Sequence, residues 1–445
     1  MNTTPSRRDL LRWGGLAAGT AVLGVGSRAA TGTSPRRFVQ INFEGGWDSA
    51  FATDPVVGSK RTANIYDPVY LTDELTPRAV AGKPQLVLGP GLIPGEGAFA
   101  RLPTAFVNGI FMEVVAHDFA SQYMKSGRLS LSNSRDFPAL PALLGAASTT
   151  FPPHVVLGSA VPLGDTRLTS PPLLAGSLDA LAGMVTGPSG ALLPPGVLAD
   201  SFDPELITDA HALIDTLDGL TYARLPRPYQ RGLDLWRSSS QRIEEIYALE
   251  LGTSLTPSAE DAARYGFTPG IGDYGPESQL AAVWLLLKSN LCQYLTVTFG
   301  SFDTHGNHLA TQLPLMQRSA LALDVLVGDL LATPDPQAPG LSLAETTTLL
   351  ITSEFVRTPT FNSYGGTEHW QSASAILMGR GVNDGAVLGA TGDDAVALGW
   401  DPVRAEVASE PLLPDHLMAT VLANVGTEEL ADTVSPIRLE GLFVS

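Results

Sequence analysis

Residue types that bind divalent metal ions gather in two short segments of this chain, residues 301–308 and 352–369. Each segment directly follows or contains the end of an apolar, β-branched run that is typical of a buried strand. Imidazole nitrogens and carboxylate oxygens at strand ends are the ligands that a divalent metal site requires. The charged and imidazole side chains concerned are Asp303, His305 and His308 in the first segment, and Glu354, Arg357 and His369 in the second.

A further acidic residue comes after the first expected strand, residues 37–43. The pair Gly45-Gly46 lets the backbone turn sharply there, and Asp48 comes two residues later. In open α/β sheets, ligands bind at the edge formed by the carboxyl ends of the strands. Asp48 is therefore a further candidate for the same site.

The elements that must position these side chains alternate between strand-like and helix-like patterns. This alternation predicts an α/β fold with a mostly parallel central sheet flanked by helices. The expected strands are residues 37–43, 128–132, 154–158, 295–299, 346–352 and 374–378. The expected helices are residues 111–124, 138–146, 204–220, 229–251, 277–290, 313–331 and 413–425.

Two regions interrupt the alternation. Residues 82–103 are rich in proline and glycine and predict a loop region. Residues 162–226 are rich in leucine, alanine, proline and glycine, and we expect them to form an insertion or cap that is not part of the sheet. With the helices that follow, this insertion is expected to span about residues 162–290.

The prediction of a metal site depends on the convergence of these segments, because parallel strands deliver their ends to one edge of a sheet. A single carboxylate after a strand is more often a helix N-cap or a turn former. Taken together, the segments favour a metal site. Two assignments stay open: the ligand is either His305 or His308, and Arg357 either binds an anionic ester or forms a salt bridge that holds Glu354.

Composition narrows the classes of function. The chain has 445 residues, of which 44% are hydrophobic and 16% charged, so it can bury a large core. Its formal net charge of −18 argues against nucleic acid or an anionic membrane as a partner. The single cysteine, Cys292, excludes an internal disulfide framework, and its apolar surroundings predict a small buried hydrophobe.

The N-terminus predicts export. Residues 1–29 contain the pair Arg7-Arg8, an apolar stretch at 13–26 and a cleavage site of small residues at 27–29, which is typical of a twin-arginine signal. The apolar stretch is shorter than the roughly 20 residues that a membrane-spanning helix needs. We expect a periplasmic or extracellular protein that starts near residue 30. The signal holds four arginines and one aspartate, so its removal leaves a net charge near −21.

These motifs resemble an exported bacterial family whose members carry domain of unknown function 1501. The resemblance covers most of the chain after the signal. That family in turn resembles the alkaline phosphatase and sulfatase superfamily, whose members place two divalent metals at the carboxyl edge of a mostly parallel sheet. The motifs are Gly-Gly-x-Asp at 45–48, Asp-Thr-His-Gly-Asn at 303–307, Ser-Glu-Phe-x-Arg-Thr-Pro at 353–359, Gly-Thr-x-His at 366–369 and a glycine-rich stretch at 379–389.

The resemblance implies a role for each matching residue. For the first metal it implies one aspartate and two histidines: Asp303, His369 and either His308 or His305. For the second metal it implies the acids Asp48 and Glu354.

This chain also departs from the pattern of the superfamily. Where the superfamily has Asp-His-Gly, the chain has Glu354-Phe355-Val356, so one histidine ligand is missing and His117 is the candidate to replace it. The serine that family members carry before this histidine is Ala116 here, which argues against a covalent nucleophile.

The resemblance thus implies an exported metal-dependent hydrolase of a phosphate or sulfate ester, either small or carried by a polymer. We expect one or two divalent ions (zinc, manganese or calcium) and catalytic roles for His117 and Arg357. The competing prediction is a non-catalytic surface or assembly protein that keeps an alkaline phosphatase-like fold, which Ala116 and Phe355 favour. A third prediction, a formylglycine sulfatase, is less favoured, because Cys292 has no Cys-x-Pro-x-Arg context.

Overall fold

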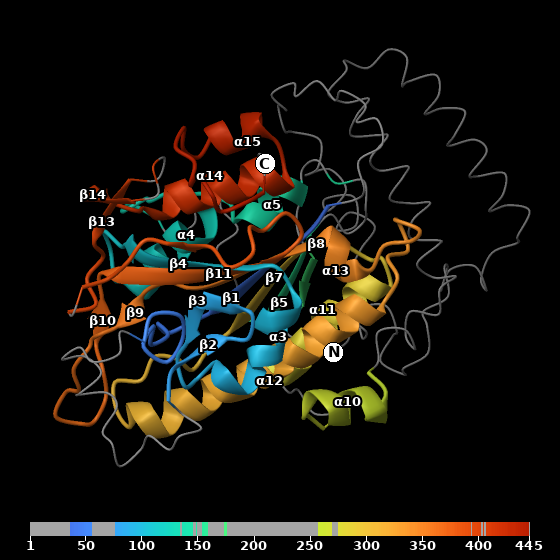
Figure 1. The fold of residues 1–445 in the computed structure, drawn as a ribbon, viewed down its shortest axis with the longest axis horizontal. Coiled ribbons are helices and arrows are strands. Elements are labelled where there is room, and N and C mark those ends of the chain that lie inside the picture. Colours follow the sequence, from blue (N-terminus) through green and yellow to red (C-terminus); the bar gives the residue numbers. More distant parts are fainter. Residues whose placement is uncertain are drawn as a thin grey trace, which may run out of the picture.

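The computed structural model describes residues 36–55, 76–133, 136–145, 148, 154–158, 173–175, 257–268, 275–392, 394–401, 404 and 406–444. In these residues a central sheet lies between two layers of helices (Figure 1). The predicted α/β fold class is confirmed.

Eight strands of the described residues form the main sheet. In spatial order they are β12 (Val387–Leu388), β4 (Thr104–Phe111), β11 (Ser372–Gly379), β8 (Thr347–Ser353), β1 (Arg37–Phe43), β7 (Tyr294–Phe299), β5 (Val155–Gly158) and β6 (Leu173–Ala175). β11 is antiparallel to both of its neighbours, and the other adjacent pairs are parallel. Every residue of β1 and β8 is buried, as expected for parallel strands that are covered on both faces.

Each face of the sheet has its own group of helices (Figure 1). Each group packs on the sheet through its own apolar cluster, so the sheet separates two cores. One group consists of α3 (Glu96–Arg101), α11 (Pro276–Lys288) and α12 (His308–Ala332), and the other of α4 (His117–Ser126), α5 (Leu140–Gly145), α14 (Pro414–Val425) and α15 (Glu428–Asp432).

Smaller elements complete the described part. Two of them, β9 (Val356–Arg357) and β10 (His369–Trp370), form an antiparallel pair beyond the end of β8. None of the described helices is long and apolar enough to cross a membrane. The other short elements are β2 (Arg78–Val80), β3 (Lys83–Leu88), η3 (Ile93–Gly95), α10 (Ala259–Tyr265), α13 (Leu343–Thr346), β13 (Gly399–Asp401) and β14 (Glu406–Pro411).

Most predicted elements that fall on described residues are confirmed to within a few residues, but two are wrong. The expected strand at 128–132 does not form. The Ser130 hydroxyl donates to Asp136 Oδ2 at 2.5 Å and accepts from the backbone N–H of Ser132 and Asn133 at 3.3 Å. These local bonds give the backbone an alternative to a strand ladder.

The second error concerns the expected helix at 111–124. Its first six residues are not helical, and the helix α4 starts only at His117. The chain before it forms strand β4, which pairs with β11 on one side and β12 on the other. Strand β4 is buried along almost its whole length, so it lacks the apolar and polar alternation by which a strand is recognised. The expected loop region at 82–103 likewise contains β3, η3 and α3.

The predicted insertion at 162–290 is described only in part. The expected signal at 1–29 and the expected helices at 204–220 and 229–251 lie outside the described residues. β6 pairs in parallel with β5, so residues 173–175 belong to the sheet, contrary to the expectation for 162–226. The apolar residues of α11 belong to the main core. The described stretches of the predicted insertion are thus integral to the main body.

Cys292 lies just before β7. Its side chain is fully buried, and burial raises the pKa of its thiol to about 12. A neutral, inaccessible thiol is a poor nucleophile and a poor metal ligand. The prediction of a small buried hydrophobe is confirmed.

Candidate metal centre

Asp303 lies just beyond the carboxyl end of β7, close to the end of β1. Phe302 before it is fully buried, and its backbone N–H donates to the carbonyl of Glu44 at 3.1 Å. Gly45 has a φ of +116°, and a Cβ there would lie 2.1 Å from the backbone nitrogen of Asp303. Only glycine allows this contact, so the glycine pair after β1 serves to bring the Asp303 loop against the sheet.

Other elements bring further polar side chains to the same edge. Glu354 directly follows β8, and His117 is the first residue of α4. The pairing of β9 with β10 places His369 directly opposite Arg357. Segments far apart in the sequence therefore meet beside Asp303.

Three imidazole rings face the Asp303 carboxylate with the same atom. The Nε2 atoms of His305 and His369 lie 3.0 and 3.2 Å from Asp303 Oδ1. The Nε2 atom of His117 lies 3.4 Å from Asp303 Oδ2. Ligand atoms of His117, Asp303 and His369 all lie within 4.8 Å of one another, and His305 Nε2 is 3.2 Å from His369 Nε2.

The opposite nitrogen of each ring is engaged with an acceptor. The Nδ1 atom of His117 lies 2.8 Å from Glu354 Oε1, that of His305 lies 2.7 Å from Glu368 Oε2, and that of His369 lies 2.9 Å from the carbonyl of Val115. A carboxylate or a carbonyl can only accept, so Nδ1 carries the proton in each neutral ring.

This tautomer leaves the Nε2 lone pairs of three rings aimed at a carboxylate. Two sets of lone pairs repel unless a cation lies between them. His117 Nε2 is in addition buried without a hydrogen-bond partner. Histidines that bind metals almost always donate their other N–H to a carboxylate or carbonyl in this way. The donor set of two imidazole nitrogens and one carboxylate oxygen, from His117, His369 and Asp303, therefore fits a divalent metal ion, and His305 Nε2 lies beside it.

The charges around the cluster suit metal binding. Burial alone would raise the pKa of Asp303, but the hydrogen bond and the charge of Arg357 outweigh it and hold this pKa below its usual value. Burial, and then the charge of His117, lowers the pKa of His369. The hydrogen bond to Glu354 is the main reason that the pKa of His117 is raised. A proton on His117 therefore competes with a metal as the pH falls.

Arg357 is fully buried and binds inward. Its Nη2 lies 2.5 Å from Asp303 Oδ1 and 3.1 Å from the carbonyl of Phe302, and its Nε lies 3.1 Å from the carbonyl of Gly46. Of the two roles left open for Arg357, the geometry fits the salt bridge, although its partner is Asp303 in place of Glu354.

The cluster itself is open to solvent. The side chains of Asp303 and His305 are 45% and 43% exposed.

The structure does not bring Asp48 and His308 into this cluster. Both are fully buried, and His308 Nε2 lies 3.0 Å from Asp48 Oδ2. His308 Nδ1 lies 2.6 Å from the hydroxyl of Thr304 and 3.0 Å from that of Thr367. Both ring nitrogens of His308 are thus engaged within the protein, beneath the loop that carries Asp303.

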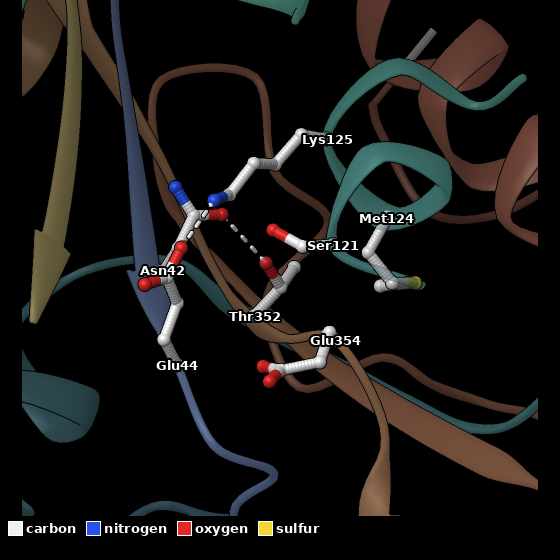
Figure 2. A pocket seen from close by; sticks show the side chains of 7 residues that line it. All are labelled: Asn42, Glu44, Ser121, Met124, Lys125, Thr352 and Glu354. Carbon is white, nitrogen blue, oxygen red and sulfur yellow. Dashed lines mark hydrogen bonds and ion pairs between the residues drawn. The ribbon is translucent and has the colours of Figure 1, made fainter. Parts of the chain in front are cut away.

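Sequence reasoning missed two charged residues beside the cluster. Glu44 follows β1 directly, and its Oε1 lies 2.9 Å from Lys125 Nζ of α4. The spacing could have identified Lys125, because residues 117, 121 and 125 are four apart and therefore lie on the same face of the helix as His117. Both charges line a small pocket (Figure 2), whose lining residues are Asn42, Glu44, Ser121, Met124, Lys125, Thr352 and Glu354.

The chain is similar to several solved structures at low sequence identity. Among solved structures, the lipoteichoic acid synthase LtaP from Listeria monocytogenes is 8% identical, with 97% of this chain and 79% of that chain covered and a TM-score of 0.36. A sulfatase from Pseudoalteromonas sp. is 11% identical, with 94% and 74% covered and a TM-score of 0.34. The alkaline phosphatase of Thermus thermophilus is 14% identical, with 75% and 64% covered and a TM-score of 0.29.

A comparison with curated protein sequences finds no match. A family model does match, over a region that includes β7, β8, the β9–β10 pair and three residues of the cluster, Asp303, His305 and His369. The model of the family described as "Protein of unknown function (DUF1501)" matches residues 258–437 of this chain.

Proposed function

We propose that this chain is a metal-dependent hydrolase of phosphate or sulfate esters, with one divalent ion held by Asp303, His117 and His369 and assisted by His305. The observation that carries the proposal is the convergence of three Nε2 atoms on one carboxylate, with every Nδ1 already bound to an acceptor. Such a site is costly to build from charges and lone pairs without a cation.

A bound divalent ion would supply a Lewis acid that neutralises ester oxygens and makes water acidic. The residues of this chain contribute orientation and charge. Arg357 fixes the carboxylate of Asp303 through the 2.5 Å ion pair. Glu354 orients the His117 ring, and its own Oε1 accepts from the backbone N–H of Gly45 at 2.7 Å. The exposed side of the cluster, at His305, is where an ester can enter.

The nucleophile in this proposal is water. Ala116 is the N-cap residue of α4, next to His117, and offers no hydroxyl. The Ser121 hydroxyl, one turn further along the helix, is buried at 7% exposure and does not reach the surface. A hydrolysis that uses water needs no covalent intermediate on the protein.

The proposal is tested by metal content and turnover together. Dialysed protein, loaded with zinc, manganese or calcium in turn, is expected to retain a stoichiometric ion and to hydrolyse phosphomonoesters, phosphodiesters or sulfate esters. Chelation should abolish turnover, and addition of the metal should restore it. A protein that holds the ion but turns over none of these esters would support the competing non-catalytic binding role. A stably folded protein without affinity for any of the three metals would refute the metal centre.

We also propose export through the twin-arginine route. The support is the sequence of residues 1–29, with Arg7-Arg8 ahead of a short apolar stretch. Replacing both arginines with lysine keeps the charge but removes the guanidinium pair. In a bacterial host with this route, the shortened wild-type chain is expected outside the cytoplasm, and the Arg7→Lys/Arg8→Lys chain should stay inside at full length. Equal export of both chains would contradict the proposal.

A further inference from the structure

Five of the seven residues that line the pocket beside the metal centre have a side-chain oxygen. Asn42 and Thr352 are paired on the neighbouring strands β1 and β8, and the Thr352 hydroxyl lies 3.2 Å from Asn42 Oδ1. Glu44 and Glu354 come from the loops that follow the same two strands, and Ser121 faces them from α4 (Figure 2). Carboxylate, amide and hydroxyl oxygens form the ligand set that hard divalent cations prefer.

One lining atom points to a missing or displaced ligand. Ser121 is only 7% exposed, and its hydroxyl is buried without a hydrogen-bond partner. A buried polar atom without a partner carries a free-energy cost, so its presence here needs an explanation. The explanation offered by the pocket is a cation position to which the hydroxyl is directed.

The ammonium group of Lys125 occupies this pocket. The Lys125 side chain is 3% exposed, and its Nζ lies 2.9 Å from Glu44 Oε1. Lysine is almost never fully buried unless it is paired. The pocket has no space for a water molecule beside these side chains, so it has none for a hydrated metal ion either.

The pocket and the metal centre share Glu354. Its Oε1 accepts from His117 Nδ1 at 2.8 Å, and His117 Nε2 faces Asp303 at 3.4 Å. Its Oε2 lies 3.2 Å from the hydroxyl of Ser353. Glu354 thus joins the imidazole cluster beside Asp303 to the oxygen-lined pocket beside Glu44.

We infer that Lys125 is a built-in monovalent cation in this oxygen-lined pocket, so that the protein binds one divalent ion where the pocket would otherwise hold another. This inference rests on the proposed function for the ion beside Asp303. Lys125 acts by occupying space and by neutralising Glu44. Shortening its side chain should therefore create a second metal site from Glu44, Ser121, Thr352 and Glu354.

The test uses manganese alone and measures the number of ions per chain by elemental analysis after dialysis, with electron paramagnetic resonance to detect coupled pairs. The wild type is expected to hold one ion without coupling. The Lys125→Ala variant is expected to hold two. Lys125→Arg, which keeps the charge and the bulk, should hold one, and Lys125→Ala/Glu44→Gln should return to one because the oxygen site loses its charge.

The outcomes separate the inference from the proposed function. Two ions in the wild type, or one ion in a folded Lys125→Ala variant, would overturn the inference and leave the metal centre in place. No ion in the wild type but one in Lys125→Ala would support the inference and overturn the metal centre. No ion in either chain would overturn both. If Lys125→Ala does not fold, as judged by circular dichroism, the wild-type count decides: one uncoupled ion supports the inference and two overturn it.

Discussion

The Asp303→Asn variant is expected to lose its bound metal ion and to lose ester hydrolysis by more than about 100-fold, because changes to groups that merely orient metal ligands already cost about 10–100-fold. Asparagine keeps the size of the side chain and still accepts the hydrogen bond from Arg357, but it removes the negative charge on which three imidazoles converge. Elemental analysis and steady-state hydrolysis measure the two losses.

A matched control is available at Asp324. This half-buried carboxylate forms an ion pair with Arg101 at the surface at 2.7 Å, so Asp324→Asn makes the same chemical change away from the metal centre. Surface ion pairs contribute little to stability, about 0–1 kcal/mol. The control should keep both its metal and its activity. Retention of the ion by a folded Asp303→Asn variant would show that the site lies elsewhere.

The second large effect distinguishes the two histidines that the sequence left open. His308→Gln is expected to lower the free energy of unfolding by about 3–5 kcal/mol, because it breaks the buried pair of the His308 imidazole and the Asp48 carboxylate. His305→Gln should change stability little, because His305 is 43% exposed, but should weaken metal binding. Urea unfolding should therefore show a loss of stability for His308→Gln, and metal titration should show a loss of affinity for His305→Gln.

The opposite result would favour His308 over His305 as the metal ligand. A His308→Gln variant of near wild-type stability that has lost its ion would place His308 among the metal ligands. A His305→Gln variant with unchanged metal affinity would remove His305 from the cluster. The two measurements are independent, because urea unfolding is measured on metal-free protein and metal affinity is measured on folded protein.

The fold class was predictable because strands such as β1 and β8 are rich in β-branched, aromatic and leucine residues and alternate along the chain with helix-like patterns. The position of β4 was not, because a buried strand next to a helix has no periodicity of its own. Residues 128–132 show a further limit: their pattern is strand-like, and hydrogen bonds from Ser130 outweigh it.

The candidate cluster shows the same division. The types and spacing of Asp303, His305 and His369 indicated a metal site at the end of β7. Spacing could not show that His308 turns inward at the start of α12. Asn307 before it adopts a left-handed backbone, with φ of 48°, which no sequence pattern predicts. His308 therefore packs with Asp48, and His305 remains at the surface.

The sequence by itself determined that metal-binding residue types follow the strands of an α/β sheet, because strand propensity and apolar patterning are local properties of the chain. Only the tertiary structure decided which of them meet. His117 and Lys125 come from α4, across the sheet edge from Asp303 and Glu44, and each contact joins residues that are far apart in the chain. Such contacts depend on the packing of the whole core, which no single segment encodes.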